Sequence, residues 1–212
     1  MNPTATLTFE KLSCSKGGRL LFRDVDASVS SGSWLYVVGA NGVGKTSLLR
    51  MVCGLAPVDS GEVRWNGEPI QKRRDLYHQS LCYLGHHNAL QESMSVTENL
   101  LFSTALSGHC VTETEIQGVL KRFGVGGRSQ QLVRHLSQGQ KRRVALARLV
   151  LSRARLWVLD EPYVAMDEAG VKMLADLVAQ HLNDGGLAVL TSHQLVPIGN
   201  IPAQLLELRS ST

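Results

Sequence analysis

The stretch at residues 34–49, WLYVVGANGVGKTSLL, decides the fold. Its first five residues form an uninterrupted apolar run, which is typical of a strand buried on both faces of a parallel sheet. The next eight fit the pattern G-x-x-x-x-G-K-[ST], and residues 45–53 have the spacing of a helix. A buried strand, a glycine-rich loop and a helix in this order predict a phosphate-binding loop.

Each part of this loop has a chemical reason. Glycines let successive backbone N–H groups face one anion, and the helix that follows points its positive end at the phosphates. We expect Lys45 to reach the β- and γ-phosphates and the Thr46 hydroxyl to bind Mg²⁺. The expected phosphate ligands are Gly39, Ala40, Asn41, Gly42, Val43, Gly44, Lys45, Thr46 and Ser47. The loop alone leaves kinases, GTPases and ATPases open.

A second apolar run, residues 156–159, ends in the acidic pair Asp160-Glu161. We expect this strand to lie beside the strand that feeds the phosphate loop, so that Asp160 holds Mg²⁺ and Glu161 polarises an attacking water. A nucleotide kinase needs no such glutamate, because its nucleophile is a hydroxyl or phosphate of the substrate. The pair therefore favours hydrolysis, although an isolated Asp-Glu pair could also cap a helix.

Composition and charge are those of a globular protein of the cytosol. The 212 residues are 43% hydrophobic and 19% charged, with a net charge of +4. The sequence contains no long apolar run and no basic start followed by an apolar segment, so we expect neither a membrane span nor a signal peptide. We interpret the basic cluster at 142–155 as a solvated helix face, not as a nucleic-acid site.

The order of the expected elements predicts an α/β fold in which a mainly parallel sheet carries helices on both faces. The expected strands are residues 7–12, 24–29, 34–38, 81–84, 156–159, 187–191 and 204–208, with turn signals at 60–63 and 66–67. The expected helices are residues 45–53, 96–106, 112–123, 138–152 and 168–182. We expect one domain, residues 1–212, with a helical lobe at about 88–150 inserted into a catalytic core of 1–87 and 151–212.

A segment before one of these helices points to a family. Leu136-Ser137-Gln138-Gly139-Gln140 resembles the LSGGQ signature of ABC ATPases, with Gln138 in place of the first glycine. The resemblance covers essentially the whole chain, because the motifs come in the family's order. It implies a P-loop NTPase fold with a small N-terminal antiparallel β subdomain. It also implies that residues 137–140 face the γ-phosphate held by a second copy, packed head to tail.

Two more segments match this family. Val164-Ala165-Met166-Asp167 matches the D-loop, which implies that Asp167 lies at the junction between subunits. His193, in Thr191-Ser192-His193, matches the histidine that contacts the γ-phosphate. The catalytic residues implied by the resemblance are Glu161, His193 and Lys45.

The sequence departs from the family at two positions. The first hairpin has Ser15, Lys16, Gly17 and Gly18 where an aromatic residue usually stacks on adenine, and the planar face of Arg19 could take that place. His86 stands where the family's Q-loop has glutamine. Because protonation changes which hydrogen bonds an imidazole makes, coupling through this loop could depend on pH. His86 and His87 together also leave a metal or haem site open.

Residues 84–90 (LGHHNAL), 144–149 (VALARL) and 190–194 (LTSHQ) are similar to the ATP-binding subunits of the bacterial cytochrome c maturation system. This resemblance implies ATP and Mg²⁺ as ligands and integral membrane subunits as partners. It also implies a peripheral position on the cytoplasmic face of the inner membrane, where ATP hydrolysis is coupled to haem export or release. The ATPase of another ABC exporter and a soluble P-loop protein are the alternatives.

Overall fold

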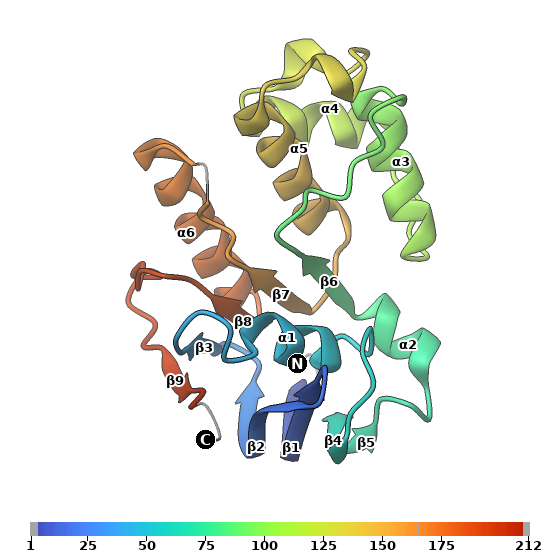
Figure 1. Ribbon diagram of the computed structural model, residues 1–212. Helices are drawn as coiled ribbons and strands as arrows, with labels where there is room; N and C mark the ends of the chain where they lie inside the picture. The colour runs from blue at the N-terminus through green and yellow to red at the C-terminus, as the bar shows by residue number, and fades with distance from the viewer. Residues whose placement is uncertain (1–3, 165, 210–212) are drawn as a thin grey trace.

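The computed structural model describes residues 4–164 and 166–209, so Ala165 of the expected D-loop lies outside the described residues. Its centre is a five-stranded sheet in which every neighbouring pair is parallel (Figure 1). The strands, in spatial order, are β6 (Leu81–Leu84), β7 (Leu156–Asp160), β8 (Leu187–Thr191), β3 (Trp34–Val38) and β9 (Gln204–Glu207). The prediction of a mainly parallel core sheet is confirmed.

One expectation about this sheet is wrong. We expected the acidic strand β7 to lie beside β3, but β8 lies between them. Asp160 at the end of β7 is therefore in register with Thr191 at the end of β8. Strand order is a non-local property that the apolar run in β7 does not encode.

A second, antiparallel sheet has the order β2 (Arg19–Ser30), β1 (Thr6–Lys16), β4 (Ser60–Trp65) and β5 (Glu68–Pro69). The β1–β2 hairpin is longer than predicted, because register shifts in β1 interrupt the alternation of apolar and polar residues. The predicted turn at 60–63 is wrong, since these residues begin β4. Gly61 lies there with φ of 85°, so close to the β1 backbone that a side chain would overlap the Glu10 and Lys11 carbonyls.

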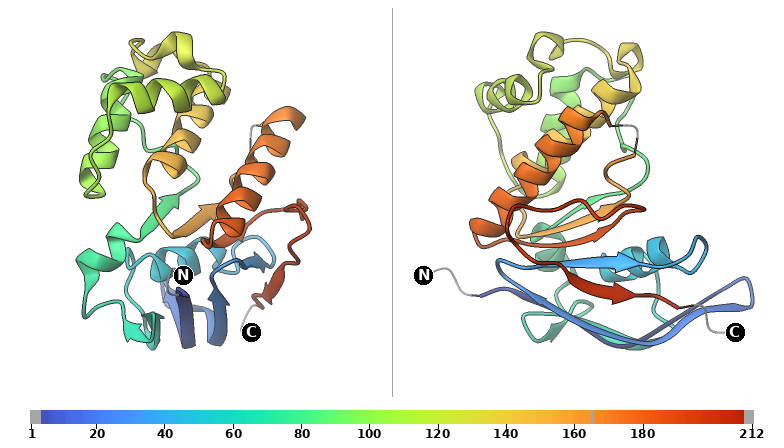
Figure 2. Two further views of the ribbon diagram at one scale, coloured as in Figure 1. Left: turned by 180° about the vertical axis from the view of Figure 1, so that it is seen from behind. Right: turned by 90° about the vertical axis from the view of Figure 1, so that its left-hand side faces the viewer.

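Helices cover both faces of the parallel sheet (Figure 2). Helix α1 (Lys45–Val52) packs between this sheet and the antiparallel one, where alternate side chains such as Leu35 and Val37 meet it. On the opposite face Trp34 and Tyr36 belong to a second core. That core also contains residues of α6 (Glu168–Asn183). The continuous apolar run in β3 therefore reflects burial on both faces.

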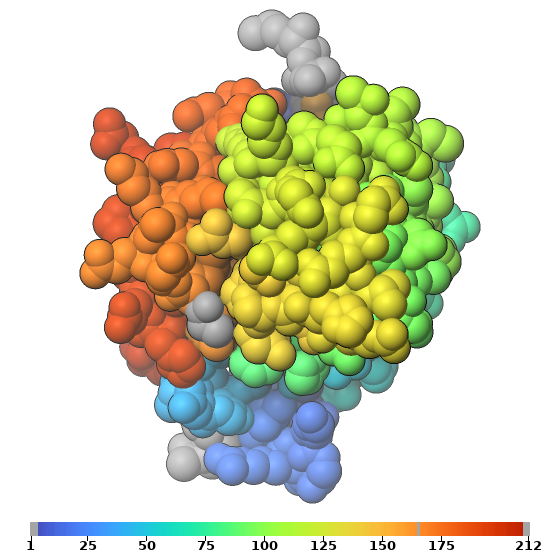
Figure 3. Space-filling view, turned by 90° about the horizontal axis from the view of Figure 1, so that it is seen from above, coloured from blue at the N-terminus to red at the C-terminus, as the bar shows by residue number. Residues whose placement is uncertain are grey.

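Three helices lie between β6 and β7 in the sequence and form a layer beside α6 (Figure 3). They are α3 (Val96–Leu106), α4 (Glu113–Arg122) and α5 (Gln138–Leu151). Each begins with a capping box, in which a serine or threonine exchanges hydrogen bonds with a residue three positions later. The short helices Gly126–Arg128 and Val133–His135 connect α4 to α5.

Helix α2 (Arg74–Gln79) was not predicted. It has only six residues. The buried Tyr77 anchors it to the core, because its hydroxyl donates to the Val52 carbonyl at 2.6 Å. Among the described residues, no helix combines the length and apolar character that crossing a bilayer requires.

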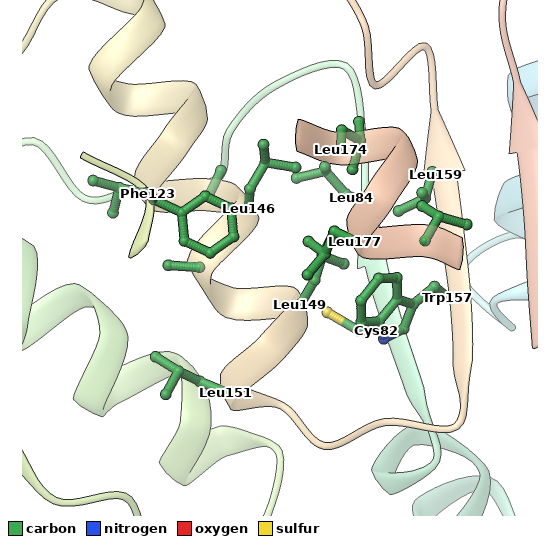
Figure 4. Close-up of a cluster of buried hydrophobic side chains, with 14 of the residues drawn as sticks. Cys82, Leu84, Phe123, Leu146, Leu149, Leu151, Trp157, Leu159, Leu174 and Leu177 are labelled. Atoms are coloured by element: carbon green, nitrogen blue, oxygen red, sulfur yellow. The ribbon is translucent and has the colours of Figure 1, made fainter. Parts of the chain in front are cut away.

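One apolar cluster joins the helices to the parallel sheet (Figure 4). It brings together α5, α6, β6 and β7 through Leu146, Leu149, Leu174, Leu177, Leu84 and Trp157. Trp157 stacks on His181 of α6 with ring centroids 3.8 Å apart and planes 5° from parallel. Burial lowers the pKa of His181 to about 4, so the folded protein favours the neutral imidazole.

This burial predicts an acid-sensitive term in stability. The unfolded chain takes up a proton at His181 below its ordinary pKa of 6.5, whereas the folded chain does so only near 4, so stability falls as pH drops between these values. From about pH 7 to about pH 5 the loss at this residue is up to about 2 kcal/mol.

Urea unfolding of the wild type and His181→Phe at both pH values measures this loss. The phenylalanine keeps an aromatic ring on Trp157 but cannot titrate, so its free energy of unfolding should fall less with acid. An equal fall in both proteins would contradict the assignment.

Candidate functional site

Three strands of the parallel sheet deliver the candidate residues to one edge. β3 runs into the glycine-rich loop, β7 ends at Asp160 and Glu161, and β8 ends at Thr191, just before His193. In parallel sheets the carboxyl ends of the strands form the usual ligand edge. The fold therefore gathers at this edge residues that are more than 100 positions apart in sequence.

The loop curls tightly between β3 and α1. Gly44, the residue before α1, has φ of 111°, and a Cβ there would lie 2.9 Å from Cδ1 of Phe22. The Lys45 ammonium folds back into the loop and donates to the carbonyls of Gly39 at 2.8 Å and Ala40 at 3.3 Å. Within the loop, Val43 points into the apolar core and is buried, whereas Thr46 is exposed. The loop thus presents a cation and the amino end of a helix on one surface, which suits a phosphate.

Asp160 is buried, and its two oxygens have different surroundings. Oδ1 accepts a hydrogen bond of 2.9 Å from the Thr191 hydroxyl, whereas Oδ2 is buried and, among the described residues, makes no hydrogen bond. Burial and the charge of Asp160 together raise the pKa of the neighbouring Tyr83 to about 12. An unpaired buried carboxylate oxygen is costly, and hard cations such as Mg²⁺ prefer such ligands.

Glu161 adopts a left-handed backbone with φ of 48°, which is unusual for a residue with a side chain. Its N–H donates to the Thr191 hydroxyl at 3.0 Å. Its carboxylate accepts from the His193 N–H at 3.2 Å, and His193 Nε2 lies 3.6 Å from Oε1. The structure therefore brings together two of the predicted catalytic residues.

The sequence analysis named Thr191 only as a neighbour of His193 and predicted no role for it. Its hydroxyl contacts both Asp160 and Glu161, so it links the two acidic residues. The sequence does show a hydroxyl residue at the end of a buried strand. It does not show which residues that hydroxyl contacts, because the contacts depend on the order of the strands in the sheet.

Arg142 is a further residue that the sequence analysis misjudged. We interpreted the basic cluster as a solvated helix face, which is wrong for Arg142, since only 5% of this residue is exposed. Its guanidinium donates to the carbonyls of Glu161 at 3.2 Å and Pro162 at 3.1 Å. It also donates to Gly85 O at 3.4 Å and to Asn88 Oδ1 at 3.2 Å. A charged residue within a basic run carries no sequence signal of burial.

The signature residues lie at the start of α5. Ser137, Gln138 and Gly139 are exposed, and Gln140 forms the capping box with Ser137. Beside them is a cavity of about 390 Å³ that is also lined by Asp167. Asp167 caps α6 by accepting from the Gly170 N–H at 2.9 Å, and its Oδ1 lies 3.7 Å from a nitrogen of Arg143.

The chain does not bring its own signature to its own phosphate loop. In Figure 1 the signature end of α5 points away from the sheet, whereas the loop lies beside α1. Within the described part of the chain, no hydrogen bond or ion pair links residues 137–140 to residues 39–47. The predicted site residues therefore form two separate groups.

His86 lies in the loop after β6, where both it and His87 are exposed and their rings meet edge to face at 5.6 Å. Across residues 4–164 and 166–209, no three histidine, cysteine or acidic side chains gather as a metal site would require. The hairpin residues Ser15, Lys16 and Arg19 are exposed at the β1–β2 turn.

Comparison with known proteins agrees with this geometry. Residues 22–164 match the ABC transporter family. The cytochrome c biogenesis ATP-binding export protein CcmA of Albidiferax ferrireducens is 70% identical over 99% of this chain and 100% of its own length. The protein of the same name from Dechloromonas aromatica is 47% identical over 93% of this chain and 95% of its own.

The fold has a similar solved counterpart. An ABC transporter ATP-binding protein from Pyrococcus furiosus superposes with a TM-score of 0.83 at 26% identity, covering 97% of this chain and 100% of that one. The sequence matches extend over nearly the whole chain and far exceed what a shared fold alone would give. The chain therefore belongs to the ABC transporter family, in the same group as these CcmA proteins.

Proposed function

We propose that this chain is the ATP-binding and ATP-hydrolysing subunit of a membrane ABC complex for cytochrome c biogenesis. In this role ATP hydrolysis is coupled to haem export, or to release of haem for c-type cytochrome assembly. The observation that supports ATP hydrolysis is the contact between Glu161 and His193, at the same edge of the parallel sheet as the phosphate loop. The similarity to the CcmA proteins, which are named cytochrome c biogenesis ATP-binding export proteins, supports the assignment to cytochrome c biogenesis.

ATP would bind with its phosphates on residues 39–47, as the folded-back Lys45 and the amino end of α1 suggest. Mg²⁺ would be held by Asp160, directly or through water, and by the Thr46 hydroxyl. The unpaired buried Oδ2 of Asp160 supports this assignment. The ion would supply positive charge to the phosphate oxygens.

Hydrolysis requires a base that aligns a water with the γ-phosphate. Glu161 suits this role, because its left-handed backbone and the Thr191 hydroxyl fix its direction. His193 would contact the γ-phosphate, and its side chain is 61% exposed, whereas that of Glu161 is 15% exposed. Lys45 would balance the negative charge that builds up on the phosphate oxygens.

We infer that two copies complete each active site. Ser137 and Gly139 are exposed and separated from the phosphate loop of their own chain. The Ser137 Oγ accepts from the Gln140 N–H at 3.3 Å, which leaves its own proton able to donate to a partner's γ-phosphate. Asp167 would lie at the junction, and the two-fold arrangement would use each surface twice.

The membrane partner would dock where the helical lobe, about residues 88–150, meets the core. Helix α3 follows the loop that carries His86, and it exposes Phe102 and Leu106 by 56% and 73%. Exposed apolar side chains one helical turn apart suit a protein interface. The chain would then be peripheral on the cytoplasmic face of the bacterial inner membrane, held there by integral membrane subunits.

For ATP hydrolysis, the first prediction concerns the proposed base, Glu161. Glu161→Gln should lower kcat for ATP hydrolysis by about 10²-fold or more, because the amide cannot accept the water's proton. ATP binding should persist, so an ATP-bound dimer should accumulate. Steady-state hydrolysis assays and size-exclusion chromatography with light scattering in Mg-ATP measure both effects.

Glu113→Gln, on the exposed first turn of α4, is the matched control and should hydrolyse ATP normally. A Glu161→Gln protein that stays monomeric in ATP would contradict the two-copy site. Normal turnover would contradict the role of Glu161.

The second prediction tests whether the site is shared. Lys45→Ala disables the phosphate loop and Ser137→Arg disables the signature, so each variant alone should be inactive. A mixed dimer, isolated through two different tags, joins one intact loop to one intact signature. It should recover up to about half of the wild-type rate, because one of its two sites is complete.

If loop and signature acted within one chain, the mixed dimer would stay inactive. Single-tag preparations of each variant give the baseline.

The third prediction concerns the pathway. Deleting the gene should abolish covalent haem attachment to periplasmic c-type cytochromes, as seen by haem staining of gels. A plasmid copy should restore it, whereas a Glu161→Gln copy should not, because transport or release needs turnover. Normal cytochromes in the deletion strain would rule out this branch.

A further inference from the structure

The Arg142 guanidinium joins three segments of the chain. It projects from α5, five residues after Ser137, the N-cap residue of that helix. On one side it donates to Gly85 O and Asn88 Oδ1, in the loop that carries His86. On the other side it donates to the carbonyls of Glu161 and Pro162, just after β7. The signature helix, the His86 loop and the proposed base therefore meet at one side chain.

All four acceptors are neutral, which is unusual for a buried arginine. Burial lowers the pKa of Arg142 and the charge of Arg148 adds to this effect, whereas the negative charge of Asp160 opposes it. The guanidinium nevertheless stays charged, so these hydrogen bonds must replace the water it has lost. If either segment moved away, some of its N–H groups would be left unpaired in the interior. The two segments are therefore coupled in position.

Arg142 also completes the support of the Glu161 backbone. Thr191 accepts from the Glu161 N–H at 3.0 Å, and Arg142 donates to the Glu161 carbonyl at 3.2 Å. A left-handed residue with a side chain persists when its surroundings hold it on both sides. Arg142 and Thr191 thus hold the backbone from which the Glu161 carboxylate projects.

We propose that Arg142 is a positioning residue for ATP hydrolysis, which links the conformation of the 85–88 loop to the aim of Glu161. When the loop holds Gly85 and Asn88 against the guanidinium, Glu161 is fixed and competent. When the loop moves, Arg142 shifts and the base loses its support. This inference rests on the proposed hydrolytic role of Glu161.

Arg148 is a matched control on the same helix. Its guanidinium donates to the carbonyls of Tyr83 at 3.2 Å, Asn88 at 3.3 Å and Ala89 at 3.1 Å. It thus holds the same loop with hydrogen bonds of the same kind. None of its hydrogen bonds within the described residues reaches Glu161 or Pro162. Comparing the two arginines separates support of the loop from support of the base.

The test measures ATP hydrolysis by the full-length chain with Arg142→Lys and Arg148→Lys. Lysine keeps the charge but cannot reach both segments at once. Arg142→Lys should lower kcat by about 10- to 100-fold, the cost of a misaimed group, with KM for ATP within about twofold. Arg148→Lys should change kcat by less than about threefold, because Arg142 still bonds to the loop and to Glu161 in that variant. Equal kcat in both variants would overturn the proposal.

A double variant shows whether Arg142 acts through Glu161. In the Glu161→Gln background, Arg142→Lys should cause no further loss, because the group that it positions is already disabled. A further loss of the same size would place Arg142 in another role and overturn the proposal. If Glu161→Gln itself turned over normally, the proposed function would fail instead, so the two failures are distinguishable.

Asn88→Ala tests the loop's share, because it removes one loop acceptor and leaves the bonds to Glu161 and Pro162. It should lower kcat as well, by about three- to tenfold, the cost of one lost hydrogen bond. An unchanged kcat would overturn the link to the loop. Thermal unfolding checks that each variant is folded, and Arg142→Gln, which buries no ammonium, replaces Arg142→Lys if the latter is unstable.

Discussion

The candidate site depends on the Thr191 hydroxyl, which donates to Asp160 Oδ1 and accepts from the Glu161 N–H. The hydroxyl is a donor in one hydrogen bond and an acceptor in the other, so its orientation is determined. They hold Asp160 with its other oxygen unpaired and hold Glu161 in a left-handed backbone beside His193. This arrangement requires β7 and β8 to be neighbours with Asp160 opposite Thr191. The parallel sheet thus determines the chemistry at its edge.

The helical layer is attached to this edge in two ways. An apolar cluster fixes α5 against β7 and α6, and a polar contact through Arg142 reaches the residues that follow β7 (Figure 4). Packing without directed bonds tolerates small rotations, whereas a buried guanidinium with four acceptors does not. If the helical lobe moved, Glu161 and the loop that carries His86 would therefore be displaced first.

Local signals made most of the fold predictable. Buried strands such as β3 and β7 stand out as apolar runs, and the α4 capping box was predicted from Thr112 and Glu115. The phosphate loop has a sequence pattern because its chemistry is local. Strand order, the length of the bulged hairpin and the burial of Arg142 are non-local, so the sequence analysis misplaced them. The lobe boundaries at 88 and 150 and the roles of the site residues stay predictions.

The separation of signature and phosphate loop explains why one chain would be an incomplete enzyme. A ligand shifts a conformational equilibrium only by its differential contacts with the two states. In a single chain ATP would contact the phosphate loop but not Ser137. Binding would therefore shift the conformational equilibrium only slightly. In a pair, the γ-phosphate would add contacts to the facing Ser137 and Gly139, and hydrolysis would remove them. The energy available to a membrane partner would come from these contacts between chains.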